Sequence, residues 1–295
     1  MRKVTSLSNN DAYTVGSKSF TAVAINTAAK AGEWIKSKVG GYNKLRQKSV
    51  ANDLVTEVDK GAEALIRNLI QTHFPHHAFL GEEGVTPGPG AFVKALDNHK
   101  DSEYLWIVDP IDGTTNFVHG YPYFSVSIAL AYKHEVIVGV VYDPVQDEMF
   151  VAEKGKGAYL TGRRMEVSAE EKLADSLLAT GFPTDRSRAL PLNMRCLQRI
   201  APQTRNIRSS GSAALHLAYV AAGRLSGFWE YGLSVWDQAA GTLLVKESGG
   251  TVTDTKGAAY GLTVSDVVAT NGHIHDSVLN ELMQEEAAFH TEIQN

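Results

Sequence analysis

The stretch Trp106–His119 reads WIVDPIDGTTNFVH, and the interpretation of the whole chain is built outward from it. Its apolar start, residues 106–108, is typical of a short buried strand, which we expect to end at Asp109. Pro110 lacks the N–H group that a strand ladder needs, so the chain is expected to turn there. A helix is then predicted to open at residues 114–116, directly after the turn.

Two carboxylates, Asp109 and Asp112, are thereby placed three residues apart at the end of a buried strand. Two anions in a partly buried site repel each other and are costly to desolvate, unless a positive charge neutralises them. Mg²⁺ is a hard cation that takes oxygen ligands, so it suits this role. The following helix start offers free backbone N–H groups and a positive dipole end, which suit phosphate. The motif therefore predicts a metal site beside a phosphate site.

Two other interpretations of the motif stay open on the residues alone. A DxxDG pattern can be a plain strand-to-helix turn that uses Asp, Pro and Gly for their geometry. Haloacid-dehalogenase phosphatases carry a similar D-x-D-G-T motif, in which the first acid is a nucleophile. There the acids are two residues apart, whereas Asp109 and Asp112 are three apart, which changes which carboxylates share a face.

The composition is that of a soluble globular chain without a general attraction for polyanions. Of the 295 residues, 43% are hydrophobic and 21% are charged. The formal net charge of −5 gives no general attraction to nucleic acid or to a membrane surface, so binding to a membrane is not expected and binding to nucleic acid is disfavoured. Cys196 is the only cysteine, so no intrachain disulfide is possible, and the first residues show no apolar leader. These observations predict a cytoplasmic protein.

The first half reads as two helices followed by a β-rich region. Apolar residues at helical spacing predict a helix over residues 20–39, and Asp59 is expected to open a second helix that runs to residue 73. A short strand over residues 78–80 runs into GEEG, and residues 85–103 are expected to form a surface loop. Short β-rich runs at hairpin spacing then predict an antiparallel meander of three strands, over residues 124–131, 136–142 and 148–153.

The second half alternates helices and strands. Strands are expected over residues 177–180, 227–230, 251–253 and 266–269, and helices over residues 189–200, up to 222, 234–247 and 275–286. We expect the chain to be a single domain, with an N-terminal α+β half over about 17–170 and a C-terminal α/β half over about 171–286.

Acidic residues recur at the ends of the expected elements: Asp59, Glu82, Asp109, Asp112, Glu230 and Asp237. Each has an ordinary explanation when taken alone, such as a helix N-cap or first-turn acid for Asp59 and a solvated turn for Glu82. Together they stand at equivalent ends of strands and helices, where α/β proteins gather ligands. We therefore expect them to converge on one metal-rich cleft.

With these residues in place, the sequence resembles the inositol monophosphatase family of lithium-sensitive, metal-dependent phosphatases. The resemblance rests on GEE at residues 81–83, WIVDPIDGTTNFVHGYPYFSVSIAL from Trp106, WDQAAGTLLVKESGG from Trp236, KSVANDLVTEVD from Lys48 and GSAA from Gly211. It implies an α/β (α+β) fold, a layered α/β/α/β/α sandwich of the sugar-phosphatase type, and a homodimer.

The resemblance also implies a role for each matching residue. The first Mg²⁺ is expected on Glu82, Asp109 and the carbonyl of Ile111, the second on Asp109, Asp112 and Asp237, and a weaker third ion on Glu82. The N–H groups of Gly113 and Thr114 are expected to hold phosphate, and Thr114 with Asp59 and Glu82 to position and activate water. The substrate alcohol is expected to contact Gly211, Ser212, Ala213 and Glu230.

The implied activity is hydrolysis of inositol monophosphate by water, with two metal ions that neutralise the phosphoryl charge. Histidinol phosphate, fructose 1,6-bisphosphate, NADP and 3′-phosphoadenosine phosphate are alternative substrates within the superfamily, although Glu230 favours a polyol over a nucleotide. Some bacterial relatives also have an interaction role in transcription or RNA processing. The chain departs from compact eukaryotic members in a longer segment between Glu83 and Trp106, which is expected near the mouth of the site.

Overall fold

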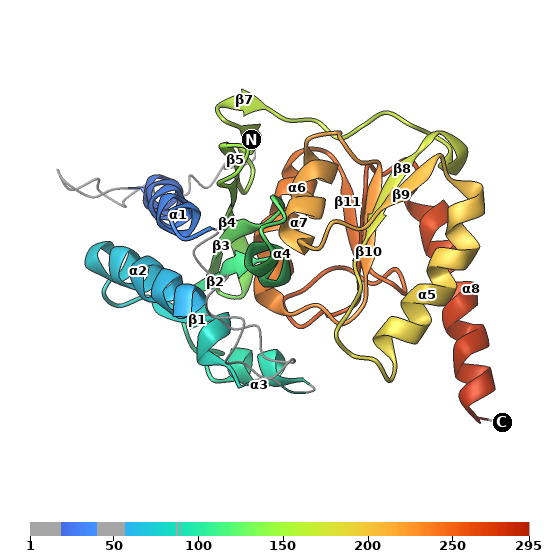
Figure 1. Ribbon diagram of the computed structural model, residues 1–295, viewed down its shortest axis with the longest axis horizontal. Coiled ribbons are helices and arrows are strands. Elements are labelled where there is room, and N and C mark those ends of the chain that lie inside the picture. The colour runs from blue at the N-terminus through green and yellow to red at the C-terminus, as the bar shows by residue number, and fades with distance from the viewer. Residues whose placement is uncertain (1–18, 40–56, 87, 89, 295) are drawn as a thin grey trace, which may run out of the picture.

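The motif at residues 106–119 lies in the first of two β-sheets, which stand side by side in Figure 1. The computed structural model describes residues 19–39, 57–86, 88 and 90–294. Residues 48–56, which carry most of the KSVANDLVTEVD motif, lie outside this part of the chain.

The first sheet has seven strands in sequence order: β1 Ala78–Gly81, β2 Tyr104–Asp112, β3 Ser125–Tyr132, β4 Glu135–Asp143, β5 Glu148–Glu153, β6 Gly157–Leu160 and β7 Arg163–Arg164. β1 runs parallel to β2, and all later neighbours are antiparallel. The predicted meander over three of these strands is confirmed, whereas β6 and β7 were not expected.

The expected end of the central strand at Asp109 is wrong. β2 continues through Pro110 to Asp112, where it pairs with Ser125 of β3 after a register shift. An irregularity of this kind accommodates a proline, because the residue inside it does not need to donate a ladder hydrogen bond. The shift also changes the direction of the strand end that carries the two aspartates.

The second sheet has five strands in the order β11-β12-β10-β8-β9, namely Thr251–Asp254, Val267–Thr270, Gly227–Glu230, Leu177–Thr180 and Asn206–Arg208. β8 lies parallel to both β10 and β9, and β12 is antiparallel to both of its neighbours. Four of the five strands were predicted within about one residue at each end. β9 was not, since its three residues carry no clear alternation.

Three layers of helices complete the α/β/α/β/α sandwich, which confirms the predicted fold class (Figure 1). The outer helices α1 Phe20–Lys36 and α2 Glu57–His73 cover the first sheet, and α5 Ala189–Ile200 and α8 His275–Gln294 cover the second. The helices α6 Ala213–Ala221 and α7 Val235–Glu247 lie between the sheets. Among the described helices, none combines the length and apolar character needed to cross a bilayer.

The middle layer explains why α7 has no polar stripe. All residues from Gln238 to Val245 are buried, because α6 and the first sheet contact the helix on different faces. Gly139 of β4 lies so close to α7 that an added Cβ would stand 2.6 Å from the Ala240 carbonyl oxygen. A helix that is apolar all round is typical of such an enclosed layer.

Three expected boundaries are wrong. Residues 85–103 are not simply a loop, because they contain the helix α3 Ala91–Asp97, which buries Phe92 and Leu96 four residues apart. α1 ends at Lys36 rather than at residue 39, and α8 continues to Gln294 rather than stopping near residue 286. Short 3-10 turns span Glu82–Gly84, Leu173–Asp175 and Ala201–Gln203.

Candidate active site

Eleven of the twelve predicted site residues line one cavity of about 610 Å³: Glu82, Asp109, Ile111, Asp112, Gly113, Thr114, Gly211, Ser212, Ala213, Glu230 and Asp237. We call this cavity the acid pocket. The twelfth residue, Asp59, lies behind the wall of the pocket, with its Oδ1 atom 3.1 Å from the Thr114 hydroxyl. Segments far apart in the sequence therefore meet here.

Each acid reaches the pocket from the end of an element. Glu82 opens the 3-10 turn after β1, and Asp109 and Asp112 stand at the end of β2 before the short helix α4, Thr114–His119. Asp237 lies in the first turn of α7, where its Oδ2 atom accepts a 2.7 Å hydrogen bond from the Ser234 backbone N–H. This capping box explains the start of α7 and fixes the direction of the Asp237 side chain.

Two of the aspartates are held by donors from the protein. Asp109 Oδ1 accepts from the Ile111 N–H at 2.9 Å. Asp112 Oδ2 accepts from the Ser212 hydroxyl at 2.6 Å and from the Ala214 N–H at 2.7 Å. The start of α6 thus contacts the end of β2, and one oxygen of each carboxylate is engaged while the second is not fixed by these bonds.

The electrostatics of the pocket are unfavourable for so many carboxylates. Burial raises the pKa of Glu82 to about 8 and the pKa of Asp112 to about 6. The pKa of Asp109 lies well above its usual range, first because of burial and then because of the charges of Glu82 and Asp112. Burial and the same two charges raise the pKa of Asp237. A bound cation would reverse these shifts, because it favours the charged carboxylates.

The donor set suits a hard divalent cation. It consists of four carboxylates and the Ile111 carbonyl, all of them oxygen donors. Within the described residues, no three Asp, Glu, His or Cys side chains already stand in the arrangement of a formed metal centre. The chemistry of the donor set nevertheless fits such an ion.

Gly113 permits the sharp turn from β2 into α4. Its φ of 97° lies in the left-handed region that favours glycine. An added Cβ would stand 3.1 Å from the carbonyl oxygens of Gly211 and Tyr123. A side chain at position 113 would therefore be strained by its φ and crowded by this backbone.

Glu230 forms the far wall of the acid pocket. It ends β10, is buried, and has its pKa raised to about 8 by burial, with a further contribution from the charge of Asp112. Gly181 leaves room for it, because a Cβ there would stand only 2.0 Å from Glu230 Oε2. A side chain at position 181 would therefore displace the Glu230 carboxylate from this place in the pocket.

Two residues that position the site were missed from the sequence. Asn116 donates from Nδ2 to the carbonyls of Tyr123 at 2.6 Å and Ser210 at 2.7 Å, and so joins α4 to the segment before α6. Glu63 of α2 accepts from the Glu83 N–H at 2.9 Å and supports the turn that carries Glu82. Asn116 lies inside the quoted motif, whereas Glu63 looks like an ordinary helical acid and gave no signal.

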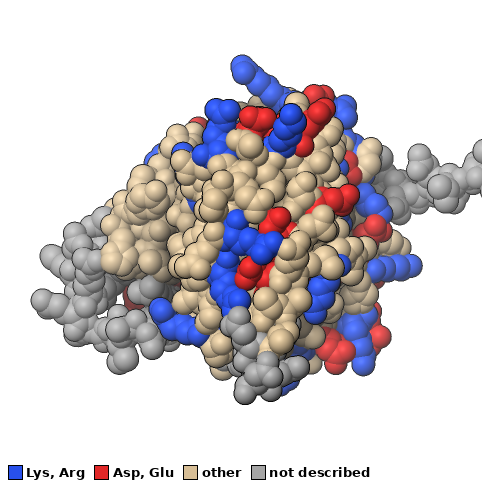
Figure 2. Space-filling model, turned by 90° about the vertical axis from the view of Figure 1, so that its right-hand side faces the viewer, with Lys and Arg blue, Asp and Glu red and all other residues tan. Residues whose placement is uncertain are grey.

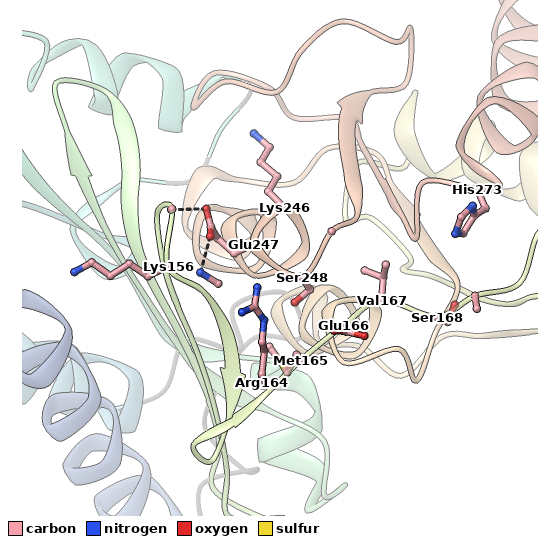
Figure 3. A pocket seen from close by; sticks show the side chains of 14 residues that line it. Lys156, Arg164, Met165, Glu166, Val167, Ser168, Lys246, Glu247, Ser248 and His273 are labelled. Atoms are coloured by element: carbon pink, nitrogen blue, oxygen red, sulfur yellow. Dashed lines mark hydrogen bonds between the residues drawn. The ribbon is translucent and has the colours of Figure 1, made fainter. Parts of the chain in front are cut away.

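A second hollow of about 640 Å³ lies between the turn Gly155–Gly157, residues 164–169, the end of α7 and His273 (Figure 3). The two carboxylate oxygens of Glu247 accept from the N–H groups of Gly155 and Gly157, each at 2.8 Å. The side chains of Lys156 and Lys246 point in different directions in Figure 3. The Glu247 carboxylate at this second hollow therefore serves the local turn, and the acid pocket is the better candidate for catalysis.

Known proteins match this chain over nearly its whole length. Residues 17–288 match the model of the Inositol monophosphatase family. The chain is 44% identical to inositol monophosphatase 2 of Solanum lycopersicum over 269 residues, which cover 90% of this chain and 99% of the relative. It is 42% identical to the Nus factor SuhB of Pseudomonas aeruginosa over 263 residues, or 88% and 94% of the two chains. The solved inositol monophosphatase of Anabaena (Nostoc) superimposes with a TM-score of 0.77 at 40% identity, covering 90% of this chain and 95% of that chain.

Proposed function

This chain belongs to the inositol monophosphatase family, and from that premise we propose that it hydrolyses inositol monophosphate to inositol and phosphate with Mg²⁺. The observation that carries the proposal is the acid pocket, in which Glu82, Asp109, Asp112 and Asp237 meet from three separate segments. Isolated acids at element ends have ordinary explanations. Four acids that share one cavity, with no Lys, Arg or His among the described residues that line it, do not.

The metal ions are assigned to the carboxylates and to one backbone carbonyl. Glu82, Asp109 and the Ile111 carbonyl would hold one Mg²⁺, Asp109, Asp112 and Asp237 would hold a second, and Glu82 would also serve a weaker third ion. When bound, Mg²⁺ supplies positive charge for the phosphoryl oxygens and lowers the pKa of water. The Asp109→Asn variant and the removal of metal with a chelator both test this assignment.

Thr114 is assigned to hold the attacking water. Its hydroxyl lies within donating distance of Asp59 Oδ1, at 3.1 Å, and of the Ile111 carbonyl oxygen, at 3.0 Å. A hydroxyl that donates to either acceptor presents its lone pairs to a water, and so orients that water toward phosphorus. Glu82 then takes the proton, and the N–H groups of Gly113 and Thr114 hold the phosphate oxygens. Direct attack by water needs no phosphoenzyme.

The alcohol part of the substrate is assigned to the wall formed by Glu230 and the start of α6. The Glu230 carboxylate can accept hydrogen bonds from ring hydroxyls, and Gly211, Ser212 and Ala213 bring backbone close to the ring. A polyol offers several such hydroxyls. This wall supports inositol monophosphate over the other small phosphate esters considered above.

A binding role of the kind suggested by the Nus factor name of the Pseudomonas relative has less support. A nucleic-acid surface is expected to show a basic patch. On the face in Figure 2, which carries α5 and α8, basic side chains stand beside acidic ones. Arg195 pairs with Glu285 at 3.2 Å and Arg199 pairs with Glu281. Charges of both signs on the α5–α8 face are typical of a solvated surface and not of a nucleic-acid interface.

The test is a substrate panel measured with and without Mg²⁺. We expect inositol monophosphate to give the highest kcat/KM, and chelation to reduce turnover to background. Li⁺ is expected to inhibit uncompetitively, because the proposal places it on the Asp109–Asp112–Asp237 cation site after hydrolysis. Full turnover in chelator would overturn the two-metal proposal, and a clear preference for another ester would replace the substrate.

The proposal extends to a homodimer, which the resemblance to the family supports. Light scattering of the purified protein is expected to give twice the mass of one 32.0 kDa chain. A monomer with full activity would remove the dimer from the proposal and leave the chemistry untouched.

A further inference from the structure

Two aromatic side chains at the mouth of the acid pocket have no part in the chemistry assigned above. Tyr121 is 53% exposed and Phe182 is 55% exposed, which makes them the two most exposed large apolar side chains in the described part of the chain. Both line the acid pocket. We call the pair the aromatic rim. Large apolar groups left in water at a pocket mouth are typical of a contact surface for a ligand.

Hydrogen bonds hold the backbone at or beside both residues. The Tyr121 N–H donates to the Asn116 carbonyl at 2.8 Å, and the Tyr121 carbonyl accepts from the Tyr123 N–H at 2.8 Å. Before Phe182, the Gly181 carbonyl accepts from Asn193 Nδ2 at 2.7 Å. A ring on a fixed backbone loses little entropy when a ligand packs against it, so the rim is prepared for binding.

The position of Phe182 relates the rim to the substrate. It directly follows Gly181, the residue whose missing side chain makes room for Glu230. Glu230 and Phe182 line the same pocket, so an ester with its phosphate among the acids and its alcohol at Glu230 would have Phe182 within its surroundings. The alcohol group meets a carboxylate on one wall and an apolar ring at the opening.

We propose that Tyr121 and Phe182 determine specificity by packing against esters whose alcohol is an aromatic ring, while Glu230 serves polyols. This inference rests on the proposed phosphatase activity of the same pocket. An aromatic alcohol has no ring hydroxyls for Glu230, but its face can pack against the rim in an offset or edge-to-face arrangement. The rim then adds a second class of accepted esters to the pocket.

The experiment compares two esters, 1-naphthyl phosphate and glycerol 2-phosphate, with Mg²⁺ present. In Phe182→Ala and Tyr121→Ala we expect kcat/KM for 1-naphthyl phosphate to fall about five- to tenfold, mainly through KM. Glycerol 2-phosphate should change less than about twofold, because it does not reach the rim. The matched control is Met283→Ala on α8, which removes a side chain of 46% exposure outside the pocket and should change neither ester.

A binding measurement separates the rim from the chemistry. Phenylphosphonate is not hydrolysed, so its inhibition constant should rise in the rim variants by the same factor, while that of methylphosphonate stays constant. If the ratio of the two esters, or of the two phosphonates, is unchanged in both variants, the rim does not select aromatic alcohols. If the unmodified protein hydrolyses inositol monophosphate but not 1-naphthyl phosphate, the rim proposal fails, and if it does not hydrolyse inositol monophosphate either, the proposed function fails instead.

Discussion

Asp109 in the acid pocket and Asp185 in the turn before α5 are the same kind of residue in opposite environments. Asp185 Oδ1 accepts from the Ser187 N–H at 2.9 Å, from the Ser187 hydroxyl and from the Arg188 N–H, and Oδ2 accepts from the Ala189 N–H at 3.2 Å. The Ser187 hydroxyl and these N–H groups lower the pKa of Asp185 to about 2. Asp109 has one such backbone donor and several carboxylates around it, and its pKa is raised.

The difference separates a structural acid from one kept for a ligand. A carboxylate that organises a turn is surrounded by donors from its own neighbourhood, so its charge stabilises the fold. A carboxylate that binds a cation is left beside other carboxylates, and its charge is unfavourable until the cation arrives. Four variants test this comparison.

The largest effect is expected for Asp109→Asn. Removing the central carboxylate should lower kcat by about a thousandfold or more, because the assigned ions lose a shared ligand. Without added metal the melting temperature should stay equal or rise, since a repelling buried group is gone. Kinetics with Mg²⁺ and thermal melting with chelator check both parts. A large loss of stability without metal would make Asp109 a structural acid like Asp185.

Glu230→Gln is expected to have the next largest effect, and only on polyols. A hydrogen bond to a charged group contributes roughly 1.5–3 kcal/mol. Its loss should reduce kcat/KM for inositol monophosphate by about one to two orders of magnitude. p-Nitrophenyl phosphate, which offers no ring hydroxyls, should lose much less. Equal losses on both esters would mean that Glu230 supports the fold or the metal site and does not bind the alcohol part of the substrate.

Asp185→Ala should affect stability rather than chemistry. Above about pH 5 the ionised carboxylate stabilises the turn, because its pKa in the folded protein, about 2, lies below its ordinary value of 3.8. That stabilisation is lost as the pH falls from about 4 toward 2. We expect a melting temperature lower by a few degrees at pH 7, a gap that narrows on acidification. A difference in melting temperature that does not depend on pH would mean that the charge of Asp185 does not stabilise the turn.

Cys196→Ser should give the smallest change. The thiol is buried in α5, 3.4 Å from the Tyr231 hydroxyl, and burial raises its pKa to about 11. A thiol in that state is a poor nucleophile, so turnover should be unchanged and stability only modestly lower. Thermal melting and kinetics on inositol monophosphate measure both quantities. A strong loss of activity in a folded variant would instead indicate that the Cys196 thiol takes part in catalysis.

Local patterns were enough to predict the elements that carry the acids. The strand before Asp109, the first turn of α7 with Ser234 and Asp237, and the strand that ends at Glu230 all have clear signals within a few residues. Recognition of the family then assigned the ligands. The sequence therefore predicts which acids line one pocket, although not the donors that hold Asp109 and Asp112.

Contacts between distant segments could not be predicted. Asp112 is held by Ser212 and Ala214, about a hundred residues later in the chain, and nothing near Asp112 indicates that partner. The short helix α3 was missed because Pro and Gly before it are typical of loops, while Phe92 and Leu96 gain their burial only from the packed core.

The enclosed position of α6 and α7 has a consequence for how this protein is made. Every strand of the first sheet is translated before either helix that covers its inner face. While the ribosome adds the second half, side chains such as Val141 and Phe150 have no middle layer to pack against, and an uncovered sheet face of this kind favours aggregation. We expect chaperones that shield nascent chains to act before α7 docks. Since Asp237 arrives with α7, the set of acids in the pocket is complete only after α7 has been made and has docked.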